Sequence, residues 1–285
     1  MNVTILNRKF KSLALMSFLS LTFAYSYANA SVAPASPFLP HGFYLGAFGG
    51  GGESTNNHAS QRGVAFFPPA AGGPLSVNAR GDIDGGAGFG GLDIGYEWQE
   101  MRVYTPLVNL GWDLIPALEL EGYYLRTTQS GQLFNPTPRL PEHDFKDTFP
   151  INTGVILIDP VVAFPLPFVG NIVYPYIGIG VGAAVLSING ADSAQLKPAE
   201  PGINHFNSNP DASDWTFAAQ GKAGLRFNLT CNFRLLAEYR FLYLASTDYT
   251  FGNTVYPTHV PTSKWKVDFR RTMFNMGALG LEYVF

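Results

Sequence analysis

The sequence predicts an all-β protein: an eight-stranded antiparallel transmembrane β-barrel with long external loops. The first observation is the last ten residues, where Leu279, Leu281, Tyr283 and Phe285 share one face and Glu282 lies on the other. Alternation of this kind indicates a strand with one apolar face. The second is a regular order of short and long connections, and the third is an export signal. An aromatic last residue suits a membrane interface better than a soluble domain.

The N-terminal segment has the pattern of a secretory signal peptide. Arg8 and Lys9 form a basic start, residues 13–24 are an apolar run, and Ala28 and Ala30 flank a small-residue cleavage site. The alternative, a membrane anchor, needs about 20 apolar residues, and this run is shorter. We therefore expect a cleaved signal peptide over 1–30, a lead-in over 31–41 and a barrel over 42–285.

The composition excludes several classes of protein. Hydrophobic residues make up 46% of the chain and charged residues only 14%, whereas globular domains carry about 25% charged residues. The net charge of −3 and the lack of a basic stripe argue against nucleic acid as a partner. The glycine runs at 49–52 and 85–91 are not followed by a helical pattern, so no cofactor is expected.

Eight segments show the alternation of strands. We expect them at 42–52, somewhere within 85–112, at 117–126, 151–164, 174–188, 215–229, 233–245 and 268–285. Short turns are expected at 113–116, 167–171 and 230–232, and long loops at 53–84, 127–150, 189–214 and 246–267. Bacterial outer-membrane barrels alternate short periplasmic turns with long external loops in this way.

The segment 85–112 is too long for one membrane strand of about 9–11 residues. One strand that extends beyond the membrane, with or without an irregular part, explains it best. Two strands that turn at Gln99 and Glu100 are the alternative, but these are poor turn residues, and nine strands would break the usual even count. A ten-stranded barrel would need a further strand near residues 64–67.

The sixth and seventh expected strands show the clearest alternation of apolar and charged side chains. One face is aromatic and aliphatic, and the other carries charges, but a single strand does not tell which face is outside. The signal peptide, the terminal Phe285 and the order of turns and loops together favour an apolar face against lipid and a charged face lining the lumen. The expected lipid-facing aromatics are Trp215, Phe217, Phe227, Phe233, Tyr239, Phe241, Tyr243, Tyr283 and Phe285. A soluble sandwich would place these faces the other way round.

The inward-facing charges form the first candidate site. They are expected to be Asp93, Glu119, Glu121, Lys222, Arg226, Arg234, Glu238, Arg240 and Glu282, five acids and four bases. An eight-stranded barrel is narrow enough for side chains to fill, and charges enclosed there must pair. A structural ion-pair network is the expectation, and a gated conduit or proton path is the alternative.

Four segments resemble the small outer-membrane β-barrel family of Gram-negative bacteria, which includes OmpA-type, OmpX and Opa proteins. They are Gly42–Gly46, Tyr174–Gly182, Leu236–Phe241 and Leu281–Phe285. The resemblance implies the barrel fold, outer-membrane lipid and lipopolysaccharide as surroundings, and a C-terminal signal (Leu279, Leu281, Tyr283 and Phe285) read by the barrel-insertion machinery. The family includes adhesins, structural proteins and small channels, so the resemblance implies little about activity.

The expected function is therefore that of a non-enzymatic outer-membrane surface protein that acts through its loops. A narrow channel is the alternative, and an outer-membrane enzyme is a third class. Arg80, Gly81 and Asp82, expected in the first long loop, match an integrin-recognition tripeptide, so host surface proteins are candidate partners. Four histidines, His58, His143, His205 and His259, fall one in each long loop, but none has the spacing of metal ligands, so no metal site is expected.

Overall fold

The computed structural model describes residues 41–99, 101–102, 113–135, 144–166 and 172–285. The signal peptide, almost all of the lead-in and the turn expected at 167–171 lie outside these residues and stay predictions. Within the described part of the chain, no helix is both long enough and apolar enough to cross a membrane.

Strands make up nearly all of the regular structure. They are β1 (Gly42–Ala65), β2 (Leu75–Glu97), β3 (Met101–Arg102), β4 (Asp113–Leu133), β5 (Phe145–Ala163), β6 (Val173–Ile188), β7 (Asp192–Gln195), β8 (Ala212–Asn228), β9 (Phe233–Leu244), β10 (Thr247–Phe251), β11 (Trp265–Phe269) and β12 (Thr272–Val284). One short 3-10 helix, η1 (Pro69–Ala71), lies in the connection between β1 and β2.

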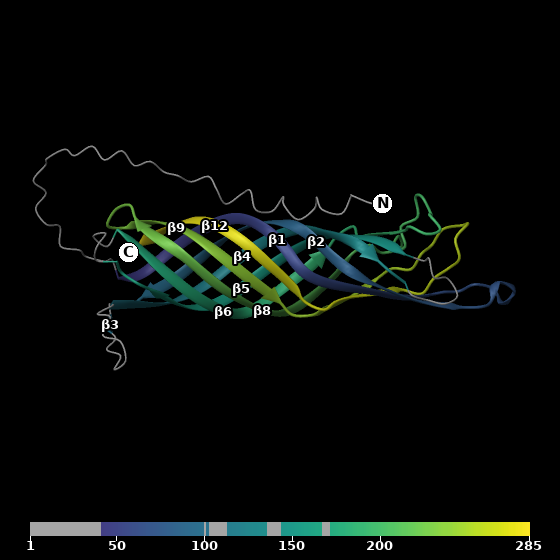
Figure 1. Cartoon of the computed structure of the whole chain (residues 1–285), viewed down its shortest axis with the longest axis horizontal. Coiled ribbons are helices and arrows are strands. Elements are labelled where there is room, and N and C mark those ends of the chain that lie inside the picture. The colour runs from purple at the N-terminus through teal and green to yellow at the C-terminus, as the bar shows by residue number, and fades with distance from the viewer. Residues whose placement is uncertain (1–40, 100, 103–112, 136–143, 167–171) are drawn as a thin grey trace, which may run out of the picture. The chain divides into compact units, whose positions relative to one another are not determined.

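Eight long strands form a closed antiparallel barrel, as the sequence predicts. The pairs run β1–β2–β4–β5–β6–β8–β9–β12, and β12 returns to β1. Closure is visible at Tyr44, which lies opposite Gly95 of β2 on one side and Val284 of β12 on the other. Figure 1 shows these strands wrapped around one axis, with β1 and β2 running on beyond the others.

Two of the four expected long loops, 53–84 and 127–150, are largely strand, so those predictions are wrong. β1 continues to Ala65 and β2 begins at Leu75, and together they form one paired hairpin across most of 53–84. β4 and β5 pair as far as Leu133 and Phe145. The segment 246–267 remains mostly a connection, with strand only at 247–251 and 265–267. Many of the polar residues that suggested loops lie on exposed strand faces, where polar side chains are favoured, although Asn57, Gln61 and Asp147 are buried.

Smaller corrections follow from the same extension of strands. Residues 113–116, expected as a turn, open β4, and Asp268 belongs to β11 rather than to the last strand. The ten-stranded alternative does not occur, because residues 64–65 end β1 instead of adding a strand. In the segment 85–112, β2 ends at Glu97 and the short β3 pairs with the start of β4.

The polarity of the sheet faces inverts along the strands. On β4, Leu120 points outward and is exposed while Glu121 is buried inside; farther along, Arg126 is exposed outside while Leu125 is buried inside. β5 shows the same change between Ile158 and Asp159 at one end and Lys146 and Phe145 at the other. An apolar outer face suits lipid and a polar outer face suits water.

This inversion divides the structure into two parts. The barrel half has an apolar outer face and contains β6, β8, β9, β12 and residues 42–52, 86–97, 115–125 and 153–163. The projecting half has a polar outer face and contains β7, β10, β11 and the remaining parts of β1, β2, β4 and β5. The barrel half therefore buries charged side chains, which an apolar medium disfavours, and the projecting half buries apolar side chains, which water disfavours.

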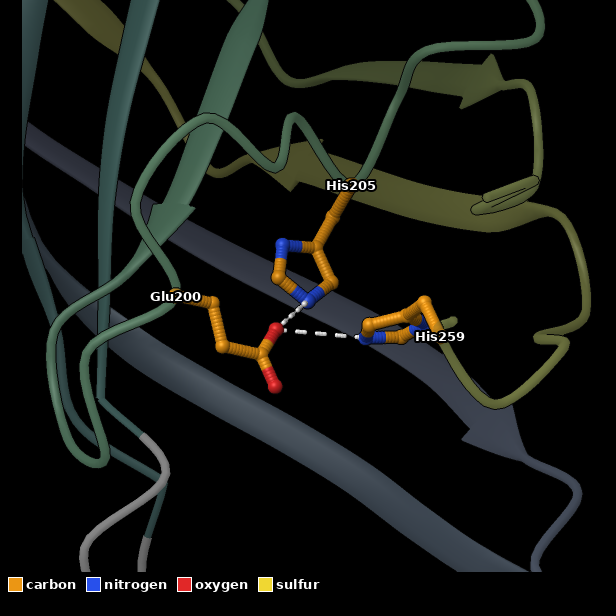
Figure 2. A group of neighbouring side chains, drawn as sticks. All are labelled: Glu200, His205 and His259. Carbon is orange, nitrogen blue, oxygen red and sulfur yellow. Dashed lines mark ion pairs between the residues drawn. The ribbon is translucent and has the colours of Figure 1, made fainter. Parts of the chain in front are cut away.

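Aromatic side chains form the core of the projecting half. Phe206 stacks on Phe251 with ring centroids 4.5 Å apart, and Phe149 meets Phe269 edge to face at 5.2 Å. His205 is also buried in this core, 5.1 Å from Phe145 between ring centroids. Figure 2 shows the polar group at its margin, where Glu200 lies between His205 and His259.

A belt of aromatic rings lies at the rim of the barrel half next to the C-terminus. Phe43 contacts Tyr96 at 4.9 Å and Tyr96 contacts Trp98 at 5.3 Å between ring centroids. Tyr283 contacts Phe285 on the adjacent β12 side, where the Phe285 amide donates to the Phe43 carbonyl at 3.0 Å. The nine aromatics expected to face lipid all lie on the outer face, exposed or half-buried. Rings of this kind are typical of a membrane–water interface.

Candidate functional site

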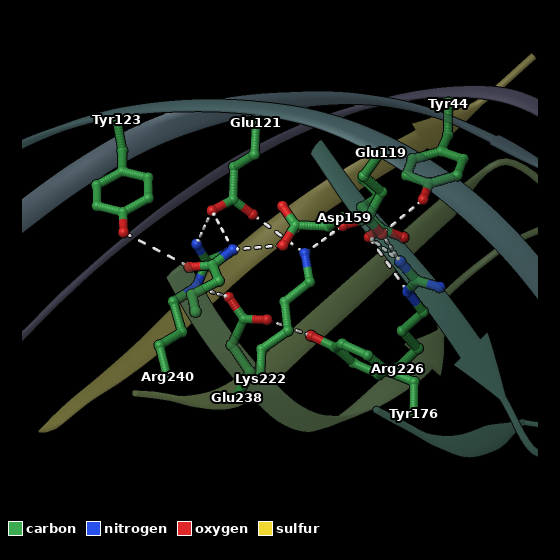
Figure 3. A network of polar contacts seen from close by, with 12 residues as sticks. Tyr44, Glu119, Glu121, Tyr123, Asp159, Tyr176, Lys222, Arg226, Glu238 and Arg240 are labelled. Atoms are coloured by element: carbon green, nitrogen blue, oxygen red, sulfur yellow. Dashed lines mark hydrogen bonds and ion pairs between the residues drawn. The ribbon is translucent and has the colours of Figure 1, made fainter. Parts of the chain in front are cut away.

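The charged interior of the barrel half is the first candidate site. All nine charges expected inside are buried there. The strands explain how they meet: Glu119 and Glu121 lie two residues apart on β4, so both point inward, and Arg240 lies on β9, four strands away around the ring. The two strands are on opposite walls, and the long side chains span the lumen (Figure 3).

The ion pairs form two connected groups. In the first, Glu121 accepts from Lys222 at 3.1 Å, pairs with Arg240 and accepts from the Gln220 amide at 3.0 Å. Lys222 also pairs with Glu119. The shared lysine links this group to the second one, which lies toward the aromatic rim.

Arg226 is the centre of the second group. Its Nη2 lies 2.7 Å from Glu119 Oε1 and 3.0 Å from Glu282 Oε1. Arg234 makes a two-pronged contact with Glu97, at 2.8 and 2.9 Å. Charged pairs with several well-aligned hydrogen bonds are the ones that offset the cost of leaving water.

Tyrosines complete the packing around the charges. The Tyr44 hydroxyl donates to Glu119 Oε1 at 2.6 Å. The guanidinium of Arg226 lies over the Tyr176 ring at 4.6 Å, and that of Arg240 lies over Phe48 at 3.8 Å. These contacts stabilise the cations while filling the interior.

Sequence reasoning missed two lumen acids. Glu97 lies in the segment whose strand could not be placed, and Asp159 follows the inward positions Val155 and Leu157 of β5 at a spacing of two, which is a signal that alternation could have supplied. The expected balance of five acids and four bases becomes seven against four. The Gln220 amide serves both Glu121 and Asp159, the latter at 2.9 Å. Asp93 is buried but forms no ion pair with the described residues.

The tripeptide Arg80-Gly81-Asp82 lies in β2, not in a loop, so its expected placement is wrong. The Arg80 main chain exchanges hydrogen bonds with Phe134 at 2.9 and 2.8 Å, and Arg80 faces Ser60 of β1 on the other edge. The side chains of Arg80 and Asp82 point outward from this flat strand. Asp82 is also 3.0 Å from His58.

The histidines expected in four separate loops are partly brought together. His205 follows β7, and His259 lies between β10 and β11; both approach Glu200, a residue that no sequence pattern singled out. His58 lies elsewhere, on β1, and His143 is outside the described residues. The terminal residues Leu279, Leu281, Tyr283 and Phe285 share the exposed outer face of the last strand.

Comparison with known proteins gave structural matches only. No known protein family matches the sequence, and no curated protein matches it. Neisserial surface protein A is 15% identical, with 85% of this chain and 97% of that chain covered and a TM-score of 0.34. The outer membrane protease OmpT of Escherichia coli is 10% identical, with 90% and 99% covered and a TM-score of 0.38.

The outer membrane protein OprG of Pseudomonas aeruginosa is 14% identical, with 85% of this chain and 96% of that chain covered and a TM-score of 0.34. These are surface and outer-membrane proteins, the class that the sequence resembles. At such low identities and TM-scores the matches carry no argument on activity. The closed ring of strand pairs is what makes this chain an eight-stranded antiparallel β-barrel.

Proposed function

We propose that the protein is a non-conducting barrel of the bacterial outer membrane that acts by surface contact through its projecting half. The observation that carries this proposal is the inversion of polarity along the strands. It leaves an apolar band of barrel outside, a charge-filled lumen inside it, and an apolar core above the lumen. A solute would have to pass both the charged side chains of the lumen and the apolar core above them, so a channel is disfavoured.

The outer surface of the barrel half supports the membrane assignment. Ile156, Ile179 and Leu279 are among the large apolar side chains exposed on it, and the aromatic belt lies at its rim. Outer-membrane lipid and lipopolysaccharide would cover this surface. Export through the cleaved N-terminal signal and insertion through the C-terminal signal remain part of the proposal.

The length of the projecting half supports a role in contact. A membrane strand needs about 9–11 residues, yet β1 has 24 and β2 has 23. The extra residues of β1 and β2 add aliphatic side chains to a core whose aromatic rings come from β5, β10, β11 and Phe206. A rigid extension of this kind presents its polar outer face to the surroundings, where a host surface protein is the proposed class of partner.

We predict that the folded protein gives no steady conductance in planar lipid bilayers. The reason is the filled lumen, where Arg226, Arg240 and Lys222 each bind carboxylates from opposite walls. Insertion is verified by the shift in gel migration between heated and unheated samples, and a porin added to the same membrane serves as positive control. Steady single-channel steps from the pure protein would contradict the proposal and favour the channel.

The contact role is tested by shortening the β1–β2 hairpin. Replacing residues 62–78 by Asn-Gly joins Gln61 to Ala79, which already face each other, through a two-residue turn that suits a hairpin. We expect bacteria that display this variant to lose attachment to host cells while the barrel remains inserted. Unchanged attachment at equal surface display would contradict a role for this part of the projecting half.

We predict that Asp82→Glu leaves host-cell attachment unchanged. Recognition of the tripeptide would need a protruding loop, whereas Arg80 and Asp82 lie in a strand paired on both edges. The added methylene would be expected to disrupt such recognition but is readily accepted at an exposed strand position. Attachment is counted on cells that display equal amounts of either protein, and a clear loss would restore the tripeptide as a recognition motif.

A further inference from the structure

Glu200, His205 and His259 form a group of metal-ligand type at the margin of the projecting half. Their donor atoms all lie within 4.8 Å of one another. Glu200 Oε2 is 3.6 Å from His205 Nε2 and 3.2 Å from His259 Nε2 (Figure 2). Zinc bound at about 2.1 Å in tetrahedral geometry separates its donors by about 3.4 Å.

The second nitrogen of each ring fixes its tautomer. His205 Nδ1 lies 2.9 Å from the Ser193 carbonyl oxygen, and His259 Nδ1 lies 2.6 Å from that of Val260. A carbonyl oxygen can only accept, so each Nδ1 carries a hydrogen, and Nε2 is the ring nitrogen left to face Glu200 and to act as a metal ligand. Metal-bound histidines are oriented by this same kind of contact.

Three potential ligand atoms therefore converge on one point. A carboxylate oxygen and two ring nitrogens repel one another unless protons or a cation lie between them. A divalent cation satisfies all three at once, whereas without a metal each ring needs its own proton on Nε2. Nitrogen and oxygen donors in this combination suit Zn²⁺ and do not suit Ca²⁺ or Mg²⁺.

The surroundings hold the two ligand segments in place. The Asn204 amide donates to Ala191 O at 2.9 Å and its side-chain oxygen accepts from Ser193 N at 3.1 Å. Thr254 donates to the carbonyl of His205 at 3.0 Å and accepts from the Trp265 ring at 3.2 Å. The ligands are thus positioned by hydrogen bonds that do not involve a metal, as a preformed site requires.

A cavity gives access to the group. Its volume is about 130 Å³, and Glu200, His205 and His259 line it together with Phe145, Gln195 and Trp265. The exposed fractions of the side chains are 2% for His205, 14% for His259 and 30% for Glu200. Glu200 is thus the most exposed of the three residues, although its Oε2 atom is itself buried, and the cavity has room for a water molecule as a fourth ligand.

We propose that Glu200, His205 and His259 bind one Zn²⁺ ion, which would cross-link the segment after β7 to the segment between β10 and β11. The site is independent of the surface-contact role. Binding of a cation here would stabilise the folded projecting half by mass action. It would weaken in acid, because protons compete with the metal for the imidazoles.

The test is a zinc titration of the folded protein in detergent, after treatment with a chelator, followed by calorimetry. We expect one equivalent of Zn²⁺ to bind in excess Ca²⁺. His259→Gln and Glu200→Gln are expected to weaken binding by more than about 100-fold, since each removes a direct ligand. His58→Gln is the matched control, because this histidine also pairs with a carboxylate, Asp82 at 3.0 Å, in the projecting half.

Folding of each variant is verified by its heat-dependent gel migration. This check is needed most for His205→Gln, because His205 is buried. Absorption of bound Co²⁺ gives a second readout, because tetrahedral nitrogen and oxygen ligands produce intense visible bands. The absence of stoichiometric binding would overturn the proposal. Equal binding by the wild type, His259→Gln and Glu200→Gln would overturn it as well, since the metal would then lie elsewhere.

Discussion

Replacing Arg226 by alanine is expected to lower the free energy of unfolding by about 3–5 kcal/mol, the usual cost of breaking a buried ion pair from one side. The guanidinium lies 2.7 Å from Glu119 and 3.0 Å from Glu282. Both carboxylates stay in the lumen after the substitution, without the cation between them. The urea concentration at half unfolding, followed by tryptophan fluorescence in lipid vesicles, measures the loss.

Arg62→Ala is the matched control for this prediction. Arg62 pairs with Asp268 in the projecting half, but its side chain is 54% exposed, so we expect a loss of at most about 1 kcal/mol. Adding Glu282→Gln to Arg226→Ala should recover part of the lost free energy of unfolding, because it removes one buried carboxylate that has lost its partner Arg226. Equal midpoints for Arg226→Ala and Arg62→Ala would show that the lumen network contributes little to stability.

The stability of the projecting half is expected to fall as the pH rises from about 4 to about 7. Burial raises the pKa of the Asp147 carboxyl to about 7, although a hydrogen bond from Ser193 acts in the opposite direction. In the unfolded chain the group titrates near 3.9. Between these values the folded state keeps a proton that the unfolded state has lost, so stability decreases with pH and levels off above 7.

The size of the effect follows from the same difference. Three pKa units correspond to up to about 4 kcal/mol. We expect Asp147→Asn to raise stability at pH 7.5 and to flatten its dependence between pH 4.5 and 7.5, as measured by hydrogen exchange of the β5 amides. Asp84→Asn, which removes an exposed carboxylate of β2, should leave the slope unchanged. A slope that persists in Asp147→Asn would assign the titration to another group.

Local periodicity was enough to predict the faces of the barrel strands. Alternation placed Lys222 and Arg226 of β8, and Arg234 and Arg240 of β9, on one face of each strand, and the export signal, the terminal Phe285 and the loop order placed that face inside; all four are buried there. A strand alternates its side chains whatever lies next to it, so a face can be assigned without a neighbour. The eight-strand count likewise followed from segments that each carry their own pattern.

Only the tertiary structure shows where along each strand the outer face changes from apolar to polar, and which residues become partners. Arg80 and Asp82 were expected in a loop because polar, glycine-rich sequence reads as a connection; pairing with β1 and Phe134 makes the segment a strand. Glu200 meets His205 and His259 only because β7 pairs with β5 while β10 and β11 add to β1, which brings the segments after β7 and between β10 and β11 together. Such contacts depend on strand register and chain closure, which are set by the whole barrel and not by any short stretch of sequence.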